Sequence, residues 1–260
     1  MGASERLWSP VSGRLTVVGL GPGRPDWCLP EVADRLRTAT DLVGYGPYLD
    51  LIGVPTVGVR HPSDNRVEAD RSRHALDLAV AGGDVVVVSS GDPGIFAMAS
   101  AIMEQLDADR DRWSDVEVEI LPGITAAQSV ASRVGAPLGH DFCVISLSDV
   151  LKPWAVIEQR LVAVAGADFV IALYNPVSRH RPWQLARAIE IIRTSRAPLT
   201  PVILGRNVGR SNESVVVVAI ADLDPSAIDM STVLVVGSST TVVIPGRPLA
   251  SSVYTPRTYP

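Results

Sequence analysis

Short, continuously apolar runs recur along this chain of 260 residues and alternate with stretches of helical periodicity. The run DVVVVS at Asp84–Ser89 is typical of a strand buried on both faces of a sheet. Strands are predicted over 15–19, 84–89, 116–121, 142–147, 168–174, 201–205, 214–220 and 232–236. Helices are predicted over 28–38, 67–81, 95–106, 125–134, 153–165 and 182–195. This alternation indicates an α/β protein.

Glycine and proline interrupt the pattern at VGAPLGHDF, residues 134–142, just before a new strand. We therefore predict two α/β domains, an N-terminal one over 13–138 and a C-terminal one over 139–250. A cleft between two such domains is a usual ligand site. The tail SSVYTPRTYP, residues 251–260, is polar and contains proline, so we expect it to be partly disordered.

The composition excludes several classes of protein. Hydrophobic residues make up 47% and charged residues 20%, which favours a packed core over global disorder. The net charge of −5 argues against nucleic-acid binding. Cys28 and Cys143 are far apart and predict neither a disulfide framework nor a metal site. No apolar run is long enough to span a membrane and the N-terminus lacks a signal pattern, so we expect a cytoplasmic protein.

A glycine-rich loop, GLGPGRPD at 19–26, follows the first predicted strand. It is similar to the dinucleotide fingerprint G-x-G-x-x-G, but its third glycine comes one residue early and Arg24 stands at the expected final glycine. Pro22 and Pro25 remove two N–H donors that a phosphate would need. Three interpretations remain open: a rigid loop lining a substrate pocket, a plain tight turn, and a nucleotide-phosphate site.

Two further glycine loops follow predicted strands, SSGDPGIF at 89–96 and LPGITAA at 121–127. Open α/β sheets bind ligands at the carboxyl ends of their strands. The first of these loops is therefore a candidate ligand site, although Asp92 could instead cap a helix. In the second, small residues would let a flat ligand lie against the backbone.

The three loops, in this order and spacing, resemble the signature of the tetrapyrrole (uroporphyrinogen/precorrin) methylases. Other stretches are similar to the precorrin-3B C-17-methyltransferase branch of that family, namely LVGYGPYLDLI, HDFCVISLSDVLKPWAVIEQRL, DFVIALYNPVSRHRPWQL, VILGRNVGRSNESV and TVLVVGSSTT. The resemblance covers about residues 13–250. It implies two α/β domains with a cleft between them, and S-adenosylmethionine as the cofactor.

The resemblance also implies which residues hold the cofactor, largely through backbone atoms. The matching positions are Ser90, Gly91, Asp92, Ile95, Thr125, Ala126, Tyr174, Asn207 and Val208. No metal is implied, because the sulfonium already activates the methyl group and methyl transfer is mainly a matter of positioning.

The implied substrate is precorrin-3B, a macrocycle with many carboxylates, and the implied partner is a second copy of the chain. The opening loop, Gly21, Pro22, Gly23 and Arg24, would face the macrocycle, and arginine suits carboxylate recognition. The candidates for that contact are Arg24, Arg60, His61, Arg66, Arg179 and Arg181.

The implied reaction adds a methyl group at C-17, contracts the ring and expels C-20 as an acetyl group. Loss of the C-20 hydroxyl proton calls for a general base. The candidate catalytic residues are Asp26, His61 and Tyr45, with Asp92 and Tyr48 as further candidates for a base and for hydrogen bonding.

Other functions remain open on the sequence. A methyltransferase acting on a cobalt-containing precorrin-3 shares the motifs, and other members of the family are weaker alternatives. In a different class, an NAD(P)-binding oxidoreductase would need a regular G-x-G-x-x-G loop at Gly19. A non-enzymatic binding protein is a further alternative.

Overall fold

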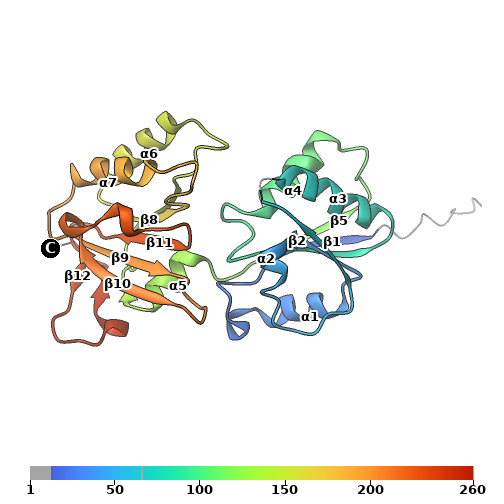
Figure 1. Ribbon diagram of the computed structural model, residues 1–260, viewed down its shortest axis with the longest axis horizontal. Coiled ribbons are helices and arrows are strands. Elements are labelled where there is room, and N and C mark those ends of the chain that lie inside the picture. The colour runs from blue at the N-terminus through green and yellow to red at the C-terminus, as the bar shows by residue number, and fades with distance from the viewer. Residues whose placement is uncertain (1–12, 66, 260) are drawn as a thin grey trace, which may run out of the picture. The chain divides into compact units, whose positions relative to one another are not determined.

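The computed structural model describes residues 13–65 and 67–259. The chain forms two compact units, unit 1 (Met1–Thr125) and unit 2 (Ala126–Pro260), each of them α/β (Figure 1). The division comes earlier than the predicted boundary at 138/139. The reason is tertiary: Val130 packs directly against Gly205, so the segment after Thr125 is part of the unit 2 fold.

Unit 1 is built on a parallel sheet with the strand order β3-β2-β4-β1-β5. The strands are β1 (Arg14–Gly19), β2 (Asp41–Tyr45), β3 (Val59–Ser63), β4 (Asp84–Ser89) and β5 (Glu117–Leu121). The segments between these strands contain helices α1 (Pro30–Thr38), α2 (Gly46–Leu49), α3 (Glu68–Val80) and α4 (Met98–Ala108), and the short η1 (Pro25–Trp27). Neither β2 nor β3 is among the strand ranges predicted above; β3 is an exposed edge strand without an apolar run.

Both faces of the unit 1 sheet are buried, as the valine run of β4 predicts. Val85 and Val87 pack in a cluster with residues of α3 and α4. Val86 and Val88 point to the opposite face and pack in a second cluster with residues of α1. This alternation explains why the strand is apolar at every position. Figure 1 shows α3 and α4 on one face of this sheet and α1 on the other.

Unit 2 contains a mixed sheet with the strand order β10-β9-β11-β8-β7. Only β7 and β8 are parallel, and each of the other pairs is antiparallel. The strands are β7 (Phe142–Ser146), β8 (Val170–Tyr174), β9 (Pro201–Arg206), β10 (Ser214–Ala219) and β11 (Thr232–Val236). The helices are α5 (Ala126–Ser132), α6 (Trp154–Gly166), α7 (Gln184–Arg193), and the short η2 (Ile220–Asp222) and η3 (Pro225–Ala227).

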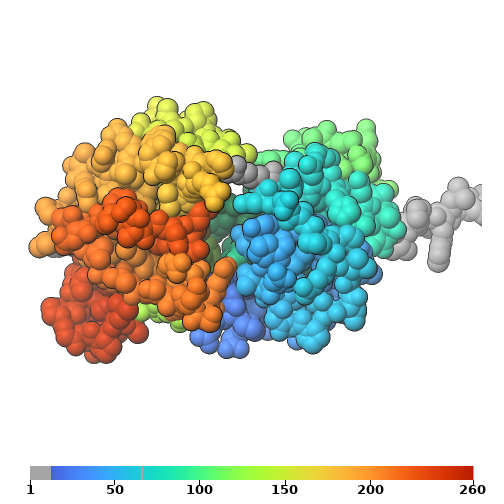
Figure 2. Space-filling model, in the orientation of Figure 1, coloured from blue at the N-terminus to red at the C-terminus, as the bar shows by residue number. Residues whose placement is uncertain are grey.

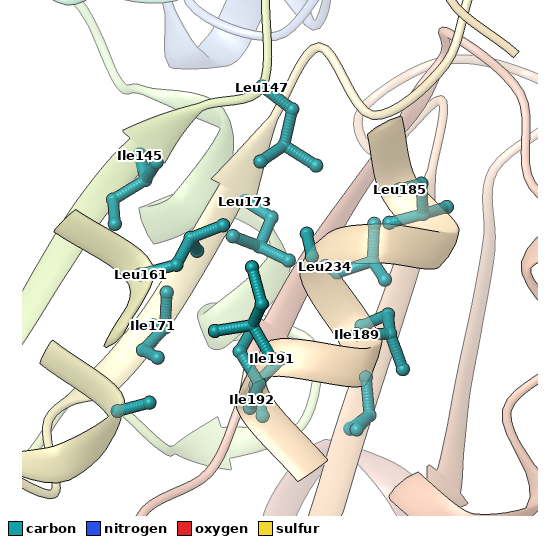
Figure 3. Close-up of a cluster of buried hydrophobic side chains, with 14 of the residues drawn as sticks. Ile145, Leu147, Leu161, Ile171, Leu173, Leu185, Ile189, Ile191, Ile192 and Leu234 are labelled. Atoms are coloured by element: carbon teal, nitrogen blue, oxygen red, sulfur yellow. The ribbon is translucent and has the colours of Figure 1, made fainter. Parts of the chain in front are cut away.

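The main core of unit 2 lies between this sheet and helices α6 and α7 (Figure 3). Leu161 of α6 and Leu185 and Ile192 of α7 are at most 1% exposed, and they pack with Ile171 and Leu173 of β8. Burial of each such side chain contributes about 1.5–3 kcal/mol. α5 lies against β9 and β11.

Residues 251–259 are ordered, contrary to the expectation for 251–260, whose last residue lies outside the described part of the chain. Val253–Tyr254 form β13, which pairs with β12 (Val242–Val243) and with β6 (Gly135–Ala136), while Leu249–Ser251 form η4. Thr255 is 3% exposed and donates to Pro137 O at 2.6 Å. This segment, red in Figure 2, lies at the surface of unit 2. Its polar side chains are used in local hydrogen bonds, which composition alone does not reveal.

None of the helices in the described parts of the chain combines the length and apolar character needed to cross a membrane.

Candidate functional site

The three glycine loops come together at one edge of unit 1. β4, β1 and β5 are neighbours in the parallel sheet, so their carboxyl ends, Ser89, Gly19 and Leu121, lie side by side. Each glycine loop begins at that last strand residue. The convergence follows from the strand order, which brings together segments about 30 to 100 residues apart in the chain.

Two glycines of this edge leave no room for a side chain. A Cβ on Gly123 would lie 2.2 Å from Gly91 O and 2.8 Å from Gly19 O. A Cβ on Gly19 would lie 2.5 Å from Gly91 O and 2.8 Å from Gly123 N. The three loops therefore pack backbone against backbone, and the glycines are required by this close approach.

The opening loop does not form a phosphate cradle. Gly21 N donates to Gly91 O at 3.1 Å, and Gly91 N donates to Gly21 O at 2.8 Å. Leu20 N donates to Ser89 O at 2.9 Å. These N–H groups are therefore used within the protein. In addition, α1 begins only at Pro30, so no helix N-terminus follows the loop directly. Both observations argue against the dinucleotide interpretation.

Asp92 links the second loop to the third. Its Oδ1 accepts from Gly94 N at 2.8 Å and its Oδ2 accepts from Gly123 N at 3.0 Å. It is not the cap of α4, because that helix begins at Met98 and its N-cap is Ala97. Asp92 instead fixes the geometry of two loops at once, and its side chain is occupied in doing so.

We call the two Asp92 bonds, to Gly94 N and Gly123 N, the Asp92 clasp. Beside it, the backbone at Gly91 has free space. Gly91 has a φ of +70°, and the nearest atom to an ideal Cβ there is Thr125 Cα at 3.9 Å. Ser90 and Ile95, also predicted to hold the cofactor, are half-buried in the same loop, while Thr125 is buried. Phe96 has a φ of +53°, which is uncommon for an aromatic residue and typical of functional loops. Unit 1 thus brings together its five predicted cofactor residues.

The predicted cofactor residues of unit 2 also lie at one sheet edge. Tyr174 ends β8, and Asn207 and Val208 directly follow β9. Both strands are antiparallel to β11, which lies between them, so their carboxyl ends share an edge. Tyr174 Oη accepts from Ala127 N at 2.7 Å, which brings Ala126 next to this edge.

Asn207 and Val208 differ in their surroundings. Asn207 has a φ of +49° and donates its N–H to Ser231 O at 3.0 Å. Val208 is 6% exposed, so its side chain belongs to the interior of unit 2. A ligand at this edge would therefore meet the backbone of Val208 rather than its side chain.

Arg24 and Asp26 form a local pair. Arg24 donates to Asp26 at 3.2 Å, and its guanidinium lies 5.4 Å from the ring centroid of Trp27. The side chain of Asp26 is 78% exposed. Both follow Gly21, Pro22 and Gly23 directly, so Arg24 extends from the segment that the Gly21–Gly91 bonds hold in place. Gly23 has a φ of +127°.

His61 and Tyr45, the other two candidate catalytic residues, stand on neighbouring strands. His61 Nε2 lies 2.8 Å from Asp41 Oδ1, and His61 Nδ1 lies 3.2 Å from Nε2 of His74. The Tyr45 ring makes an edge contact with Tyr48 at 5.2 Å. Asp41 and His74 were missed: Asp41 begins a strand, His74 lies on a helix, and only the fold joins them to His61.

The other arginines predicted to contact the substrate differ in their surroundings. Arg179 is exposed on the loop after β8. Arg181 is 6% exposed and donates to Leu147 O at 3.3 Å and to Asn175 O at 2.8 Å, so its guanidinium is engaged within unit 2, and its contact with a substrate stays a prediction. Arg66 lies outside the described residues.

Cys28 and Cys143 are free thiols, and burial raises the pKa of Cys143 to about 11 and also raises that of Cys28. The described part of the chain contains no group of three His, Cys, Asp or Glu side chains able to hold a metal ion.

Comparison with known proteins identifies the family. Residues 14–224 match the model of the Tetrapyrrole (Corrin/Porphyrin) Methylases. A precorrin-3B C(17)-methyltransferase of Sinorhizobium sp is 48% identical over 249 residues, 96% of this chain and 98% of that protein. The cobalamin biosynthesis protein CobIJ of Mycobacterium bovis is 51% identical over 254 residues, and there the match spans 96% of this chain but only 49% of the relative.

Solved structures agree with this result. The crystal structure of the methyltransferase CobJ has a TM-score of 0.88 and 48% identity, and covers 94% of this chain and 100% of that one. Uroporphyrin-III C-methyl transferase from Thermus thermophilus, solved with S-adenosyl homocysteine, has a TM-score of 0.66 at 21% identity over 86% of this chain and 97% of that one, which shows a shared fold. The chain belongs to the tetrapyrrole (corrin/porphyrin) methylase family.

Proposed function

We propose that the protein transfers a methyl group from S-adenosylmethionine to C-17 of precorrin-3B and contracts the ring to give precorrin-4, in cobalamin biosynthesis. The observation that carries this proposal is the match to the Sinorhizobium precorrin-3B C(17)-methyltransferase, which extends over nearly the whole of both chains at 48% identity. The chain spans about half the length of the CobIJ relatives, so the activity is proposed from the full-length match.

The open backbone beside the Asp92 clasp fits a methyl donor held by backbone atoms. An added Cβ at Gly91 would have no closer neighbour than 3.9 Å, so there is room for a ligand beside this residue. The N–H of Gly91 is bonded to Gly21 O, so the cofactor would bind to other backbone groups of the loop. In our proposal Ser90, Gly91, Asp92, Ile95 and Thr125 line the site from unit 1. The bound S-adenosylmethionine would supply a methyl group already activated on a sulfonium.

We further propose that Ala126, Tyr174, Asn207 and Val208 are the cofactor-binding residues of unit 2. Tyr174 acts partly through its bond to Ala127 N, which fixes the start of α5. Asn207 adopts a positive φ, so the peptide groups on either side of it are turned away from the regular strand direction. Backbone atoms set in this way can discriminate a ligand by shape and hydrogen bonding.

The macrocycle would contact the opening loop, Gly21, Pro22, Gly23 and Arg24, together with Arg179. Arg24 is the sharpest candidate in this set. It extends from a segment that is locked to the cofactor loop by the Gly21–Gly91 bonds, and its partner Asp26 is exposed. A substrate carboxylate could therefore take the place of Asp26 on the guanidinium.

His61 is the candidate base with the most support, and Asp26 and Tyr45 are the others. Because the carboxylate of Asp41 only accepts, it orients His61 with a hydrogen on Nε2. Nδ1 of His61 then faces Nε2 of His74. A proton would enter this pair at Nδ1 of His74 while the Nε2 hydrogen of His74 passes to Nδ1 of His61, so His61 acts as a base through His74.

A second candidate function is methylation of a cobalt-containing substrate. A probable cobalt-factor III C(17)-methyltransferase of Salmonella typhimurium is 40% identical over 248 residues and is matched over 99% of its length. Parallel assays with the metal-free and the cobalt-containing substrate separate the two. A preference for the metal-free substrate supports the lead proposal.

We also propose that the protein is a cytoplasmic homodimer. Sedimentation at several concentrations tests the oligomeric state, and a monomer at all concentrations would contradict it.

Isothermal titration with S-adenosylhomocysteine and with NAD tests the cofactor directly. The proposal predicts micromolar binding of S-adenosylhomocysteine and none of NAD. The opposite pattern would favour an oxidoreductase and would contradict the proposal.

The Arg24→Ala variant tests the substrate loop. The side chain makes no bond to the cofactor loop, so the variant should bind S-adenosylhomocysteine normally while KM for the macrocycle rises about tenfold, the effect of losing one charge-assisted pair. An unchanged KM would remove Arg24 from the site.

A further inference from the structure

Unit 1 contains a pocket of about 450 Å³ next to β3 and the first turns of α3, outside the three glycine loops. Pockets of this size hold small ligands or parts of larger ones. Its polar walls come from side chains that are far apart in the sequence: Arg60, His61, Ser63, Asp70, Arg71 and His74.

Arg71 is a buried cation in this wall whose acceptors are all neutral. The residue is 5% exposed. Its guanidinium donates to Ser63 Oγ at 2.8 Å and to Asp64 O at 2.6 Å, and its third contact is the sulfur of Met98 at 3.3 Å. Thioether sulfur is a weak acceptor, so the hydrogens of that nitrogen are poorly satisfied.

No carboxylate of the described residues forms an ion pair with Arg71. Burial lowers the pKa of the guanidinium, against smaller opposing effects of Glu68 and Tyr48. A buried charge is costly unless an opposite charge compensates it. The pocket beside Arg71 is therefore the natural place for an anion.

The other side chains that line the pocket also favour an anion. Among the described residues, Arg60 has one ion-pair partner, Asp50, at 3.8 Å. Asp70, the one acidic side chain of the lining, is already paired with Arg73. In the His61–His74 pair the two Nε2 hydrogens are used towards Asp41 and towards Nδ1 of His61, so the pair offers a donor to an anion at Nδ1 of His74 when that atom carries a proton. Of the pocket's described lining residues, two are arginines, and the one carboxylate, Asp70, is already paired with Arg73.

We propose that this pocket is a carboxylate-binding subsite in which Arg71 and Arg60 hold one carboxylate arm of the tetrapyrrole beside the His61–His74 pair. The planar fork of arginine matches a carboxylate, and the volume also admits the ring edge that bears the arm. The identity of the ligand rests on the proposed function, whereas the carboxylate chemistry rests on the pocket itself.

A small-molecule titration tests the pocket without the macrocycle. The chain has four histidines, His61, His74, His140 and His180, so the imidazole signals can be followed by NMR in the full-length protein. Propionate should shift the His61 and His74 signals and leave those of His140 and His180 in place. Equal shifts at all four, no shift, or a response to inorganic phosphate but not to propionate would overturn the proposal.

A second experiment uses a porphyrin octacarboxylate as the probe and measures its dissociation constant by fluorescence quenching. Arg71→Lys keeps the charge but loses the fork, and Arg60→Ala leaves the buried contacts intact should Arg71→Lys fail to fold. Each should weaken binding about tenfold, the effect of one lost charge-assisted pair. The control is Arg37→Gln, an exposed α1 side chain paired with Asp34, which should bind as the parent does.

The two proposals fail separately. Porphyrin binding that is indifferent to Arg60 and Arg71 overturns the subsite, while methyl transfer to precorrin-3B would stand. Loss of S-adenosylhomocysteine binding and methyl transfer in the parent protein, with the propionate response retained at His61 and His74, overturns the proposed function and supports the carboxylate subsite.

Discussion

Asp92 offers the clearest quantitative test of how the glycine loops are held. The Asp92→Ala variant removes a carboxylate that accepts backbone N–H bonds from Gly94 at 2.8 Å and from Gly123 at 3.0 Å. A hydrogen bond to a charged group contributes about 1.5–3 kcal/mol. Because Asp92 is only half-buried, the lower end applies, and the two bonds together give about 3 kcal/mol.

This loss should appear both in stability and in ligand binding. Urea unfolding should show a free energy of unfolding lower by about 3 kcal/mol. Titration with S-adenosylhomocysteine should show at least about tenfold weaker binding, because Gly91 and Thr125 lose their fixed positions. Asp92→Asn should cost about half as much, since its amide keeps one acceptor but meets the other N–H with a donor.

The control for this experiment is Asp34→Asn. The side chain of Asp34 is 75% exposed, and its one ion pair among the described residues is with Arg37 in the same helix, so the change should stay within about 0.5 kcal/mol. Unfolding and binding curves for Asp92→Ala that coincide with those of the parent would refute the clasp. Loss of stability with unchanged affinity would limit Asp92 to a structural part.

Three further changes test other parts of the account. Gly123→Ala places a Cβ 2.2 Å from Gly91 O, so the free energy of unfolding measured with urea should fall by about 2–4 kcal/mol. The control is Gly166→Ala, whose Cβ would have nothing within 4 Å and which should be neutral. Equal effects of the two variants would contradict the close packing of the loops. Tyr174→Phe removes the hydroxyl oxygen that accepts from the buried Ala127 N–H, so the free energy of unfolding should fall by about 1–3 kcal/mol. An unchanged free energy of unfolding would contradict this hydrogen bond. Burial raises the pKa of the Cys143 thiol from 9.0 to about 11, so the unfolded chain loses its proton first and stability should fall between pH 9 and 11, by about 2–3 kcal/mol. A Cys143→Ala variant with the same pH dependence would refute this.

The sequence predicts those elements whose signal is local. The four valines of β4 indicate a strand buried on both faces, and the structure confirms it, because alternate valines pack into the clusters on opposite faces. β3 carries Arg60, His61 and Pro62 at the sheet edge and has no apolar run. The two-residue strands β6 and β13 pair over more than a hundred residues, which no local pattern can indicate.

In the candidate site, too, the sequence predicts the local features and not the contacts between distant residues. Each glycine loop is visible as a motif after a strand. That Gly19, Gly91 and Gly123 touch is a consequence of the strand order β4-β1-β5, and that Asp41 and His74 bracket His61 follows from the pairing of β2 with β3 and the packing of α3. The boundary between the units depends on the contact of Val130 with Gly205, which is equally non-local.

The central claim is that the chain methylates and contracts a corrinoid macrocycle. Its most direct test is incubation of the protein with precorrin-3B and S-adenosylmethionine that carries a ¹³C-labelled methyl group, followed by mass and NMR analysis of the product. The account predicts one labelled methyl group on C-17 and C-20 present as an acetyl group. Recovery of unlabelled precorrin-3B, or a label on any other ring carbon, would contradict it.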